Sequence, residues 1–179
     1  MQLLVESVSV VVPVYNSCAT LSELYNRLCR ILDSEVGVFE VLFVDDGSRD
    51  DSWEVLADLA RMDARIRPFR LMCNYGQHNA VLCGIREARY STIVTIDDDL
   101  QQYPEDIPKL LALLADNDVV YGIFQEEKHG FLRKLASALI KTILKKTMGV
   151  SIAISLSSFR AFRTELRKSF VTYCGAMPI

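Results

Sequence analysis

The stretch that decides the fold is Thr92-Ile-Val-Thr-Ile96, which runs directly into Asp97-Asp-Asp-Leu-Gln101. A short run of β-branched residues predicts a buried strand, and the acidic triplet marks its carboxyl end. Side-chain alternation places Asp97 and Asp99 on one side, and Gln101 joins them if the chain stays extended. Three oxygen donors on one face suit a hard cation such as Mg²⁺ or Mn²⁺. The alternative is a solvated acidic turn before the next helix.

Similar elements flank this strand along the chain. Apolar runs predict four more strands, at residues 8–14, 39–44, 67–71 and 118–123. Apolar side chains at helical spacing predict helices that begin near residues 20, 53, 78 and 104. A capping box is predicted at Thr20 and Glu23, and Pro104 occupies the first-turn position that proline prefers. The alternation predicts an α/β fold with a mostly parallel central sheet flanked by helices.

A second acidic pair, Asp45-Asp46, follows the predicted strand at residues 39–44 and precedes Gly47. Ligands of parallel α/β sheets bind beyond the carboxyl ends of the strands. The pair can therefore share a crevice with the acidic triplet, and Pro13 and Tyr15, at the end of the first strand, border the same crevice. Ordinary explanations remain open, namely an Asp-Gly turn for the pair and a proline loop for the strand end.

Charge is distributed unevenly along the 179 residues. Residues 1–127 hold 10 Lys+Arg and 22 Asp+Glu, whereas residues 128–179 hold 10 Lys+Arg and a single acid. The acidic part suits a metal ion, and the basic part suits phosphate or an anionic membrane surface. An odd count of five cysteines without a C-x-x-C pair favours a reduced, cytosolic compartment.

The segment at residues 131–148 combines apolar residues near helical spacing with basic side chains, among them Lys141, Lys145 and Lys146. This pattern predicts a basic amphipathic helix at a membrane surface. A helix that packs on the sheet with a solvated lysine face is the alternative. No signal peptide and no transmembrane helix are predicted. The end of the chain, without an obvious stop to the fold, suggests C-terminal truncation.

Four motifs in fixed order carry a family resemblance. They are Val10-Val-Val-Pro-Val-Tyr-Asn16, Val44-Asp-Asp-Gly-Ser48, Asn74-Tyr-Gly-Gln-His-Asn-Ala80 and Ile96-Asp-Asp-Asp-Leu-Gln101 with Pro104-Glu105. Together they resemble the inverting glycosyltransferase family 2, which has the GT-A fold. Within that family, the set is most similar to the polyprenyl-phosphate glycosyltransferases. The resemblance extends from about residue 8 to the end of the chain.

The resemblance implies roles for particular residues. It assigns metal binding to Asp97, Asp99 and Gln101, with Mg²⁺ or Mn²⁺ bridging the donor diphosphate. It assigns catalysis to Asp99 and to Arg133, a basic position near the acceptor phosphate. The residues implied to bind the nucleotide are Pro13, Tyr15, Asp45, Asp46, Asp97 and Asp98. Asp98, in the middle of the triplet, is not expected to bind the metal.

The implied organisation is one GT-A catalytic domain over residues 1–179. Residues 1–127 would bind nucleotide sugar and metal, and residues 128–179 would face the acceptor and the membrane. The implied donor is a UDP-sugar, with a GDP-sugar as the alternative; the implied acceptor is polyprenyl phosphate, and no nucleic-acid partner is expected. The implied location is the cytoplasmic face of a membrane, with the full-length protein anchored there.

Two other functions remain open. The same donor could serve a saccharide acceptor in cell-envelope polysaccharide synthesis. Related chains often carry an aspartate where this chain has Ile154-Ser155, and residues 153–156 contain no carboxylate. That difference leaves open a catalytically incomplete, nucleotide-binding domain.

Overall fold

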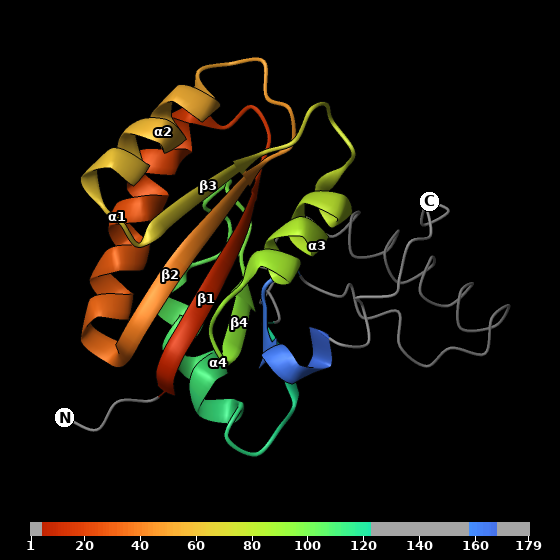
Figure 1. Ribbon diagram of the computed structural model, residues 1–179. Coiled ribbons are helices and arrows are strands. Elements are labelled where there is room, and N and C mark those ends of the chain that lie inside the picture. The colour runs from red at the N-terminus through yellow and green to blue at the C-terminus, as the bar shows by residue number, and fades with distance from the viewer. Residues whose placement is uncertain (1–4, 123–157, 168–179) are drawn as a thin grey trace, which may run out of the picture. The chain divides into compact units, whose positions relative to one another are not determined.

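The computed structural model describes residues 5–122 and 158–167 (Figure 1). The chain divides into two compact units, residues 1–121 with 158–179, and residues 122–157. The fold described below is that of the first unit. The predicted basic helix at 131–148, Arg133 and residues 153–156 lie outside the described residues.

A six-stranded sheet forms the centre of this unit, in the order β3-β2-β1-β4-β6-β5. Its strands are β1 (Val5–Val14), β2 (Val36–Asp45), β3 (Ile66–Arg70), β4 (Thr92–Thr95), β5 (Val119–Tyr121) and β6 (Arg160–Arg163). Strands β3, β2, β1 and β4 are parallel, whereas β6 lies antiparallel to both β4 and β5. The predicted mostly parallel sheet is therefore confirmed, with one antiparallel strand inserted near its edge.

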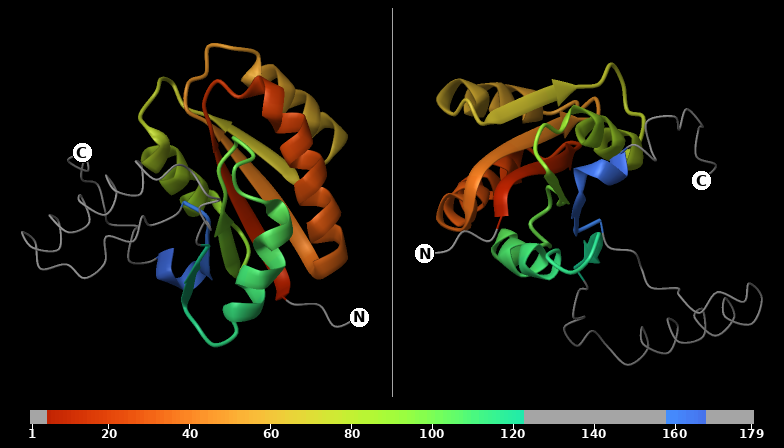
Figure 2. Two further views of the ribbon diagram at one scale, coloured as in Figure 1. Left: turned by 180° about the vertical axis from the view of Figure 1, so that it is seen from behind. Right: turned by 60° about the horizontal axis from the view of Figure 1, so that its bottom comes forward.

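Helices cover both faces of the sheet (Figures 1 and 2). The helical elements are α1 (Cys18–Glu35), α2 (Ser52–Met62), α3 (Gln77–Glu87), η1 (Pro104–Asp106), α4 (Ile107–Leu113) and η2 (Thr164–Arg167). Apolar side chains of α1, α2 and α4 pack on the face that carries Val10 and Val12. Those of α3 pack on the opposite face, against Val11. Because side chains of β1 alternate between the two faces of the sheet, they pack into two separate hydrophobic cores.

The start of α1 differs from its prediction. The helix begins at Cys18, and its N-cap residue Ser17 makes no side-chain cap hydrogen bond, so the predicted capping box is wrong. The Thr20 hydroxyl instead lies 2.7 Å from the carbonyl oxygen of Asp98 and 3.0 Å from that of Ser17, and these two acceptors share its single proton. Thr20 therefore ties α1 to the acidic triplet rather than capping the helix.

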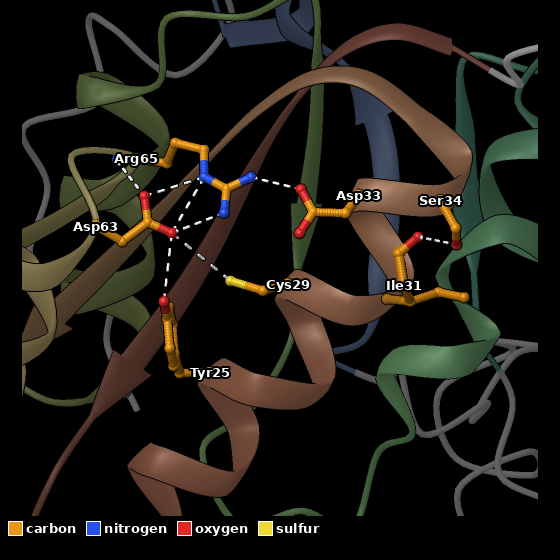
Figure 3. A network of polar contacts seen from close by, with 7 residues as sticks. All are labelled: Tyr25, Cys29, Ile31, Asp33, Ser34, Asp63 and Arg65. Atoms are coloured by element: carbon orange, nitrogen blue, oxygen red, sulfur yellow. Dashed lines mark hydrogen bonds and ion pairs between the residues drawn. The ribbon is translucent and has the colours of Figure 1, made fainter.

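A polar network joins α1 to the amino end of β3, away from the carboxyl ends of the strands (Figure 3). The Arg65 guanidinium donates to Asp63 (2.8 Å) and to Asp33 (2.5 Å), and its carbon lies 4.3 Å from the centre of the Phe39 ring. The Tyr25 hydroxyl donates to Asp63 over 3.3 Å. These contacts pin α1 and the α2–β3 connection together.

The strand order creates a switch point between β1 and β4. The chain steps from β1 to β2 and β3 on one side, and β4 then pairs with the other side of β1. Connections therefore leave the two neighbouring strands in opposite directions, which opens a crevice at their carboxyl ends. Among the helices of the described residues, none is both long and apolar enough to cross a bilayer.

Candidate functional site

A cavity of about 230 Å³ lies at this switch point. It is lined by the end of β1 and the residue after it, by residues that follow β2 and β4, and by the turn into α3 with the first residue of that helix. The lining residues are Pro13, Val14, Tyr15, Asp46, Asn74, Gly76, Gln77, Asp97, Asp98 and Asp99. Four carboxylates and no Lys or Arg are among them, so this cavity is acidic.

The structure brings together six of the residues predicted to form the site. They are Pro13, Tyr15, Asp46, Asp97, Asp98 and Asp99. Asp45 and Gln101 do not line the cavity, and Arg133 lies outside the described residues. Gln101 departs because Leu100 adopts a positive φ of 61°, so the chain does not stay extended beyond Asp99. Placement in the cavity does not test the roles, which remain predictions.

The triplet is held from several sides. The Asp98 carboxylate accepts from the Tyr15 backbone N–H (3.2 Å), which links the ends of β4 and β1. The Asp99 carboxylate accepts from the Gln101 backbone N–H (3.0 Å). Burial raises the pKa of Asp98, and the charge of Asp99 adds to the rise, against opposing hydrogen bonds from Ser17 and Tyr15. Negative charge is therefore held here at an electrostatic cost.

The carboxylate of Asp97 accepts hydrogen bonds on both oxygens. Gln77 Nε2 donates to Oδ1 (2.6 Å), whereas Gln102 Nε2 (2.6 Å) and the Ser158 hydroxyl donate to Oδ2. Burial raises the pKa of Asp97; the hydrogen bonds oppose the rise and the charge of Asp99 adds to it. All three donors are neutral, so they orient the carboxylate without cancelling its charge.

Asp46 anchors the loop at residues 73–76, which contributes Asn74 and Gly76 to the lining of the cavity. Its two carboxylate oxygens accept from the backbone N–H groups of Tyr75 (2.7 Å) and Gly76 (2.8 Å). The next residue, Gly47, has a φ of +72°, and a Cβ there would lie 2.7 Å from the carbonyl carbon of Cys73. The Asp-Gly pair is thus more than an ordinary turn, because it fits the 73–76 loop against the end of β2.

Asp45 lies beneath the site rather than in it. Its side chain is fully buried, and Oδ1 accepts from the Ser48 backbone N–H (3.0 Å). Oδ2 lies 3.3 Å from Arg70 Nε, which is ion-pair distance without hydrogen-bond alignment. In this structure Asp45 shapes the turn after β2 and anchors Arg70.

The arrangement fits a divalent cation together with a ligand that supplies oxygen donors. Carboxylate oxygens are what Mg²⁺ and Mn²⁺ prefer, and a cation would relieve the repulsion among the clustered acids. Within residues 5–122 and 158–167, no three His, Cys, Asp or Glu side chains are arranged to hold an ion by themselves. Mg²⁺ in proteins commonly binds one or two carboxylates together with substrate phosphates.

Sequence reasoning missed Gln102 and Ser158, which both contact Asp97. Gln102 is 3% exposed, and it lies next to the glutamine that the extended-chain argument selected. Ser158 reaches the site only because β6 pairs antiparallel with β4. Neither the helical spacing nor the alternation of apolar residues in the sequence indicates either contact.

Comparisons with known proteins agree with this architecture. The model of the family described as "Glycosyl transferase family 2" matches residues 9–170. An undecaprenyl-phosphate 4-deoxy-4-formamido-L-arabinose transferase of Edwardsiella ictaluri is 37% identical over 93% of this chain and 52% of its own length. Its counterpart in Shewanella sediminis is 36% identical over 93% of this chain and 51% of its own length. The chain spans about half the length of these curated relatives.

Solved structures share the fold. TarS residues 1–349 of S. aureus match with a TM-score of 0.63 and 22% identity, over 91% of this chain and 48% of that one. Glucosyl-3-phosphoglycerate synthase of Mycobacterium tuberculosis, crystallised with Mn²⁺ and UDP, matches with a TM-score of 0.66 and 19% identity. The match covers 90% of this chain and 58% of the synthase chain.

The fold and the acidic crevice at its switch point define an α/β protein of the GT-A type, as expected from the sequence. With the family model covering most of its length, the chain belongs to glycosyltransferase family 2.

Proposed function

We propose that the full protein transfers a sugar, with inversion, from a nucleotide-diphosphate sugar to polyprenyl phosphate, and that a divalent cation assists the transfer. The observation that carries this proposal is the acidic cavity of about 230 Å³ at the switch point, which Asp46, Asp97, Asp98 and Asp99 line together. An anionic diphosphate can enter such a cavity only with a cation that offsets the like charges.

Asp97 and Asp99 would hold the metal ion, Mg²⁺ or Mn²⁺. When bound, the ion offsets the negative charge that grows on the departing nucleoside diphosphate. Asp99 has the more accessible position, because its side chain is exposed whereas that of Asp97 is half-buried. Gln101 remains a predicted ligand, although its side chain lies outside the cavity described above.

The nucleotide would lie between the ends of β1 and β2. Pro13 and Tyr15 form the β1 side of the cavity, and Tyr15 is 43% exposed, which leaves its ring available for stacking on a base. Asp46 holds the loop at residues 73–76, and Asp98 holds the Tyr15 backbone. A UDP-sugar is the favoured donor, with a GDP-sugar as the alternative; the synthase crystallised with UDP supports the former.

The acceptor is assigned on the names of the relatives and on charge. The relatives are named as undecaprenyl-phosphate transferases. A lipid phosphate is already anionic near neutral pH, so the transfer needs positioning more than a strong base. Arg133 and the basic part at residues 128–179 would supply that positioning at the cytoplasmic face of the membrane, while residues 1–127 bind the donor.

Product analysis with the full-length gene product tests the proposal. With Mn²⁺ and a panel of UDP- and GDP-sugars, we expect mass spectrometry to detect a sugar linked to undecaprenyl phosphate. A product formed only on a saccharide acceptor would contradict the lipid assignment. Mn²⁺-dependent nucleotide binding without turnover on either acceptor would instead identify a catalytically incomplete domain, in line with the missing carboxylate at residues 153–156.

A further inference from the structure

Gln102 has an unusually complete set of contacts for a buried amide. Its oxygen accepts from the Asp97 backbone N–H (2.9 Å), and its nitrogen donates to Asp97 Oδ2 and to the Ser158 hydroxyl oxygen (2.6 Å each). Only this amide orientation pairs the oxygen with an N–H and the nitrogen with a carboxylate. The side chain is 3% exposed, so its position is set by these bonds and by packing.

Ser158 completes the arrangement from another part of the chain. Its hydroxyl contacts Asp97 Oδ2, and its carbonyl oxygen accepts from the Thr95 hydroxyl. Thr95 pairs with Arg160 in the β4–β6 ladder, so the antiparallel strand delivers Ser158 to the back of Asp97. Two residues distant in sequence therefore hold the same carboxylate oxygen.

The geometry points to Gln102 and Ser158 as positioning residues, a neutral clamp that aims the Asp97 carboxylate into the cavity. This inference rests on the proposed function, in which Asp97 serves the metal–nucleotide site. The clamp holds Oδ2 from the buried side. Oδ1 contacts Gln77, an exposed residue that itself lines the cavity, so this oxygen can exchange its partner for a ligand.

Neutrality of the clamp is the property that matters for binding. A Lys or Arg in place of Gln102 could donate to the carboxylate but would also offset its charge, and it would offer no acceptor to the Asp97 backbone N–H. The amide and the hydroxyl leave the full charge available to a cation. Groups that orient metal ligands from outside the coordination sphere typically change metal affinity or activity by about 10–100-fold when they are removed.

The test measures Mn²⁺ binding to the full protein in the presence of UDP, from the electron paramagnetic resonance signal of free Mn²⁺. Gln102→Glu keeps the size of the side chain but replaces the donor with a carboxylate oxygen, and Ser158→Ala removes the hydroxyl. We expect both to weaken Mn²⁺ binding by about 10–100-fold. Ser158→Thr, which keeps a hydroxyl, should stay within about threefold of the unmodified protein, as expected for a positioning role.

Asn26→Asp is the matched control, because it makes the same amide-to-acid change at an exposed position of α1. It should leave Mn²⁺ binding unchanged. Circular dichroism and thermal unfolding establish that each variant is folded. Should Gln102→Glu fail to fold, the difference in Mn²⁺ affinity between Ser158→Ala and Ser158→Thr tests the inference by itself.

Two outcomes separate the clamp from the proposed function. No Mn²⁺ binding by the unmodified protein with UDP would overturn the proposed function itself. Normal binding by the unmodified protein, together with unchanged Mn²⁺ affinity in folded Ser158→Ala, would overturn the clamp and leave the metal site standing. A lower melting temperature with unchanged affinity would assign Gln102 and Ser158 a purely structural role, which also contradicts the inference.

Discussion

At the scale of single residues, Gly47 is where backbone geometry and the site depend on each other most closely. Gly47→Ala should destabilise the protein by roughly 3 kcal/mol or more. About 1–3 kcal/mol comes from a side chain at positive φ, and the rest from a Cβ placed 2.7 Å from the Cys73 carbonyl carbon. Urea unfolding followed by circular dichroism measures the loss.

Gly76→Ala separates the two causes. Gly76 also has a positive φ, of 90°, but a Cβ there would meet nothing within 4 Å. Its substitution should therefore cost only the conformational strain, about 1–3 kcal/mol. An equal or larger loss at Gly76 than at Gly47 would show that the contact with the 73–74 backbone is unimportant.

Leu100 marks the limit of what the sequence could predict at this scale. Asp97 and Asp99 were predictable as neighbours, because a strand end and its alternation bring them together. The positive φ of Leu100 turns Gln101 out of the cavity, and Gln102 occupies the buried position instead. Leucine rarely adopts this conformation, so nothing local in the sequence announces it. Tertiary contacts of the triplet decide it.

At the scale of elements, α3 packs unusually close to the sheet at Gly84. A Cβ at Gly84 would lie 2.4 Å from Val11 Cγ1 and 3.2 Å from Val44 Cγ2. Gly84→Ala should therefore cost about 1–3 kcal/mol through overpacking, despite the better helix propensity of alanine. Chemical denaturation measures this change.

The double variant Gly84→Ala/Val11→Ala tests the cause. Shortening Val11 removes the nearest clashing atom. The double variant should therefore lose less stability than the sum of the losses in Gly84→Ala and Val11→Ala, with a coupling of about 0.5–3 kcal/mol. Strictly additive losses would mean that α3 shifts away from the sheet and that the close approach is not required.

Asp50 joins the starts of two helices. Its carboxylate accepts from the backbone N–H groups of Cys18 (3.1 Å) and Ser52 (3.1 Å). Burial would raise its pKa, but the hydrogen bonds from Ser52 and Cys18 outweigh burial and lower the pKa from 3.8 to about 2. A carboxyl whose folded pKa is depressed stabilises the fold above its unfolded pKa and loses that contribution as pH falls through the folded value.

Asp50→Asn should therefore be less stable than the unmodified protein at pH 7, by about 1–2 kcal/mol, because hydrogen bonds to a carboxylate are stronger than those to a neutral amide oxygen. The difference in free energy of unfolding should narrow as pH falls from about 4 to about 2, because the aspartate becomes protonated in that window. Other carboxyls titrate in both proteins and cancel in the difference. A difference that stays constant over this range would contradict the assignment.

At the scale of the whole molecule, most of the sheet follows from the sequence. The strands at residues 8–14, 39–44, 67–71 and 92–96 were predictable because parallel strands covered on both faces are short apolar runs. The position of β6 between β4 and β5 was not, since strand order depends on pairing that only the folded chain reveals. For the same reason Ser158 could not be assigned to the site.

The charge asymmetry of the chain leads to a prediction about membranes. Charge reversal of Lys141, Lys145 and Lys146 to glutamate should release the protein from anionic vesicles, by over a hundredfold in affinity if each lysine contributes about 1 kcal/mol. Sedimentation with anionic vesicles measures this, with zwitterionic vesicles as the control. Unchanged sedimentation would rule out a role for this basic segment in membrane binding.

The most direct test of the metal–nucleotide site is calorimetry of UDP binding to the full protein with Mn²⁺ or with EDTA. We expect binding that requires Mn²⁺ and is lost in Asp99→Ala, while the thermal unfolding of that variant shows an intact fold. Tight UDP binding in EDTA, or unchanged Mn²⁺-dependent binding by Asp99→Ala, would contradict this expectation.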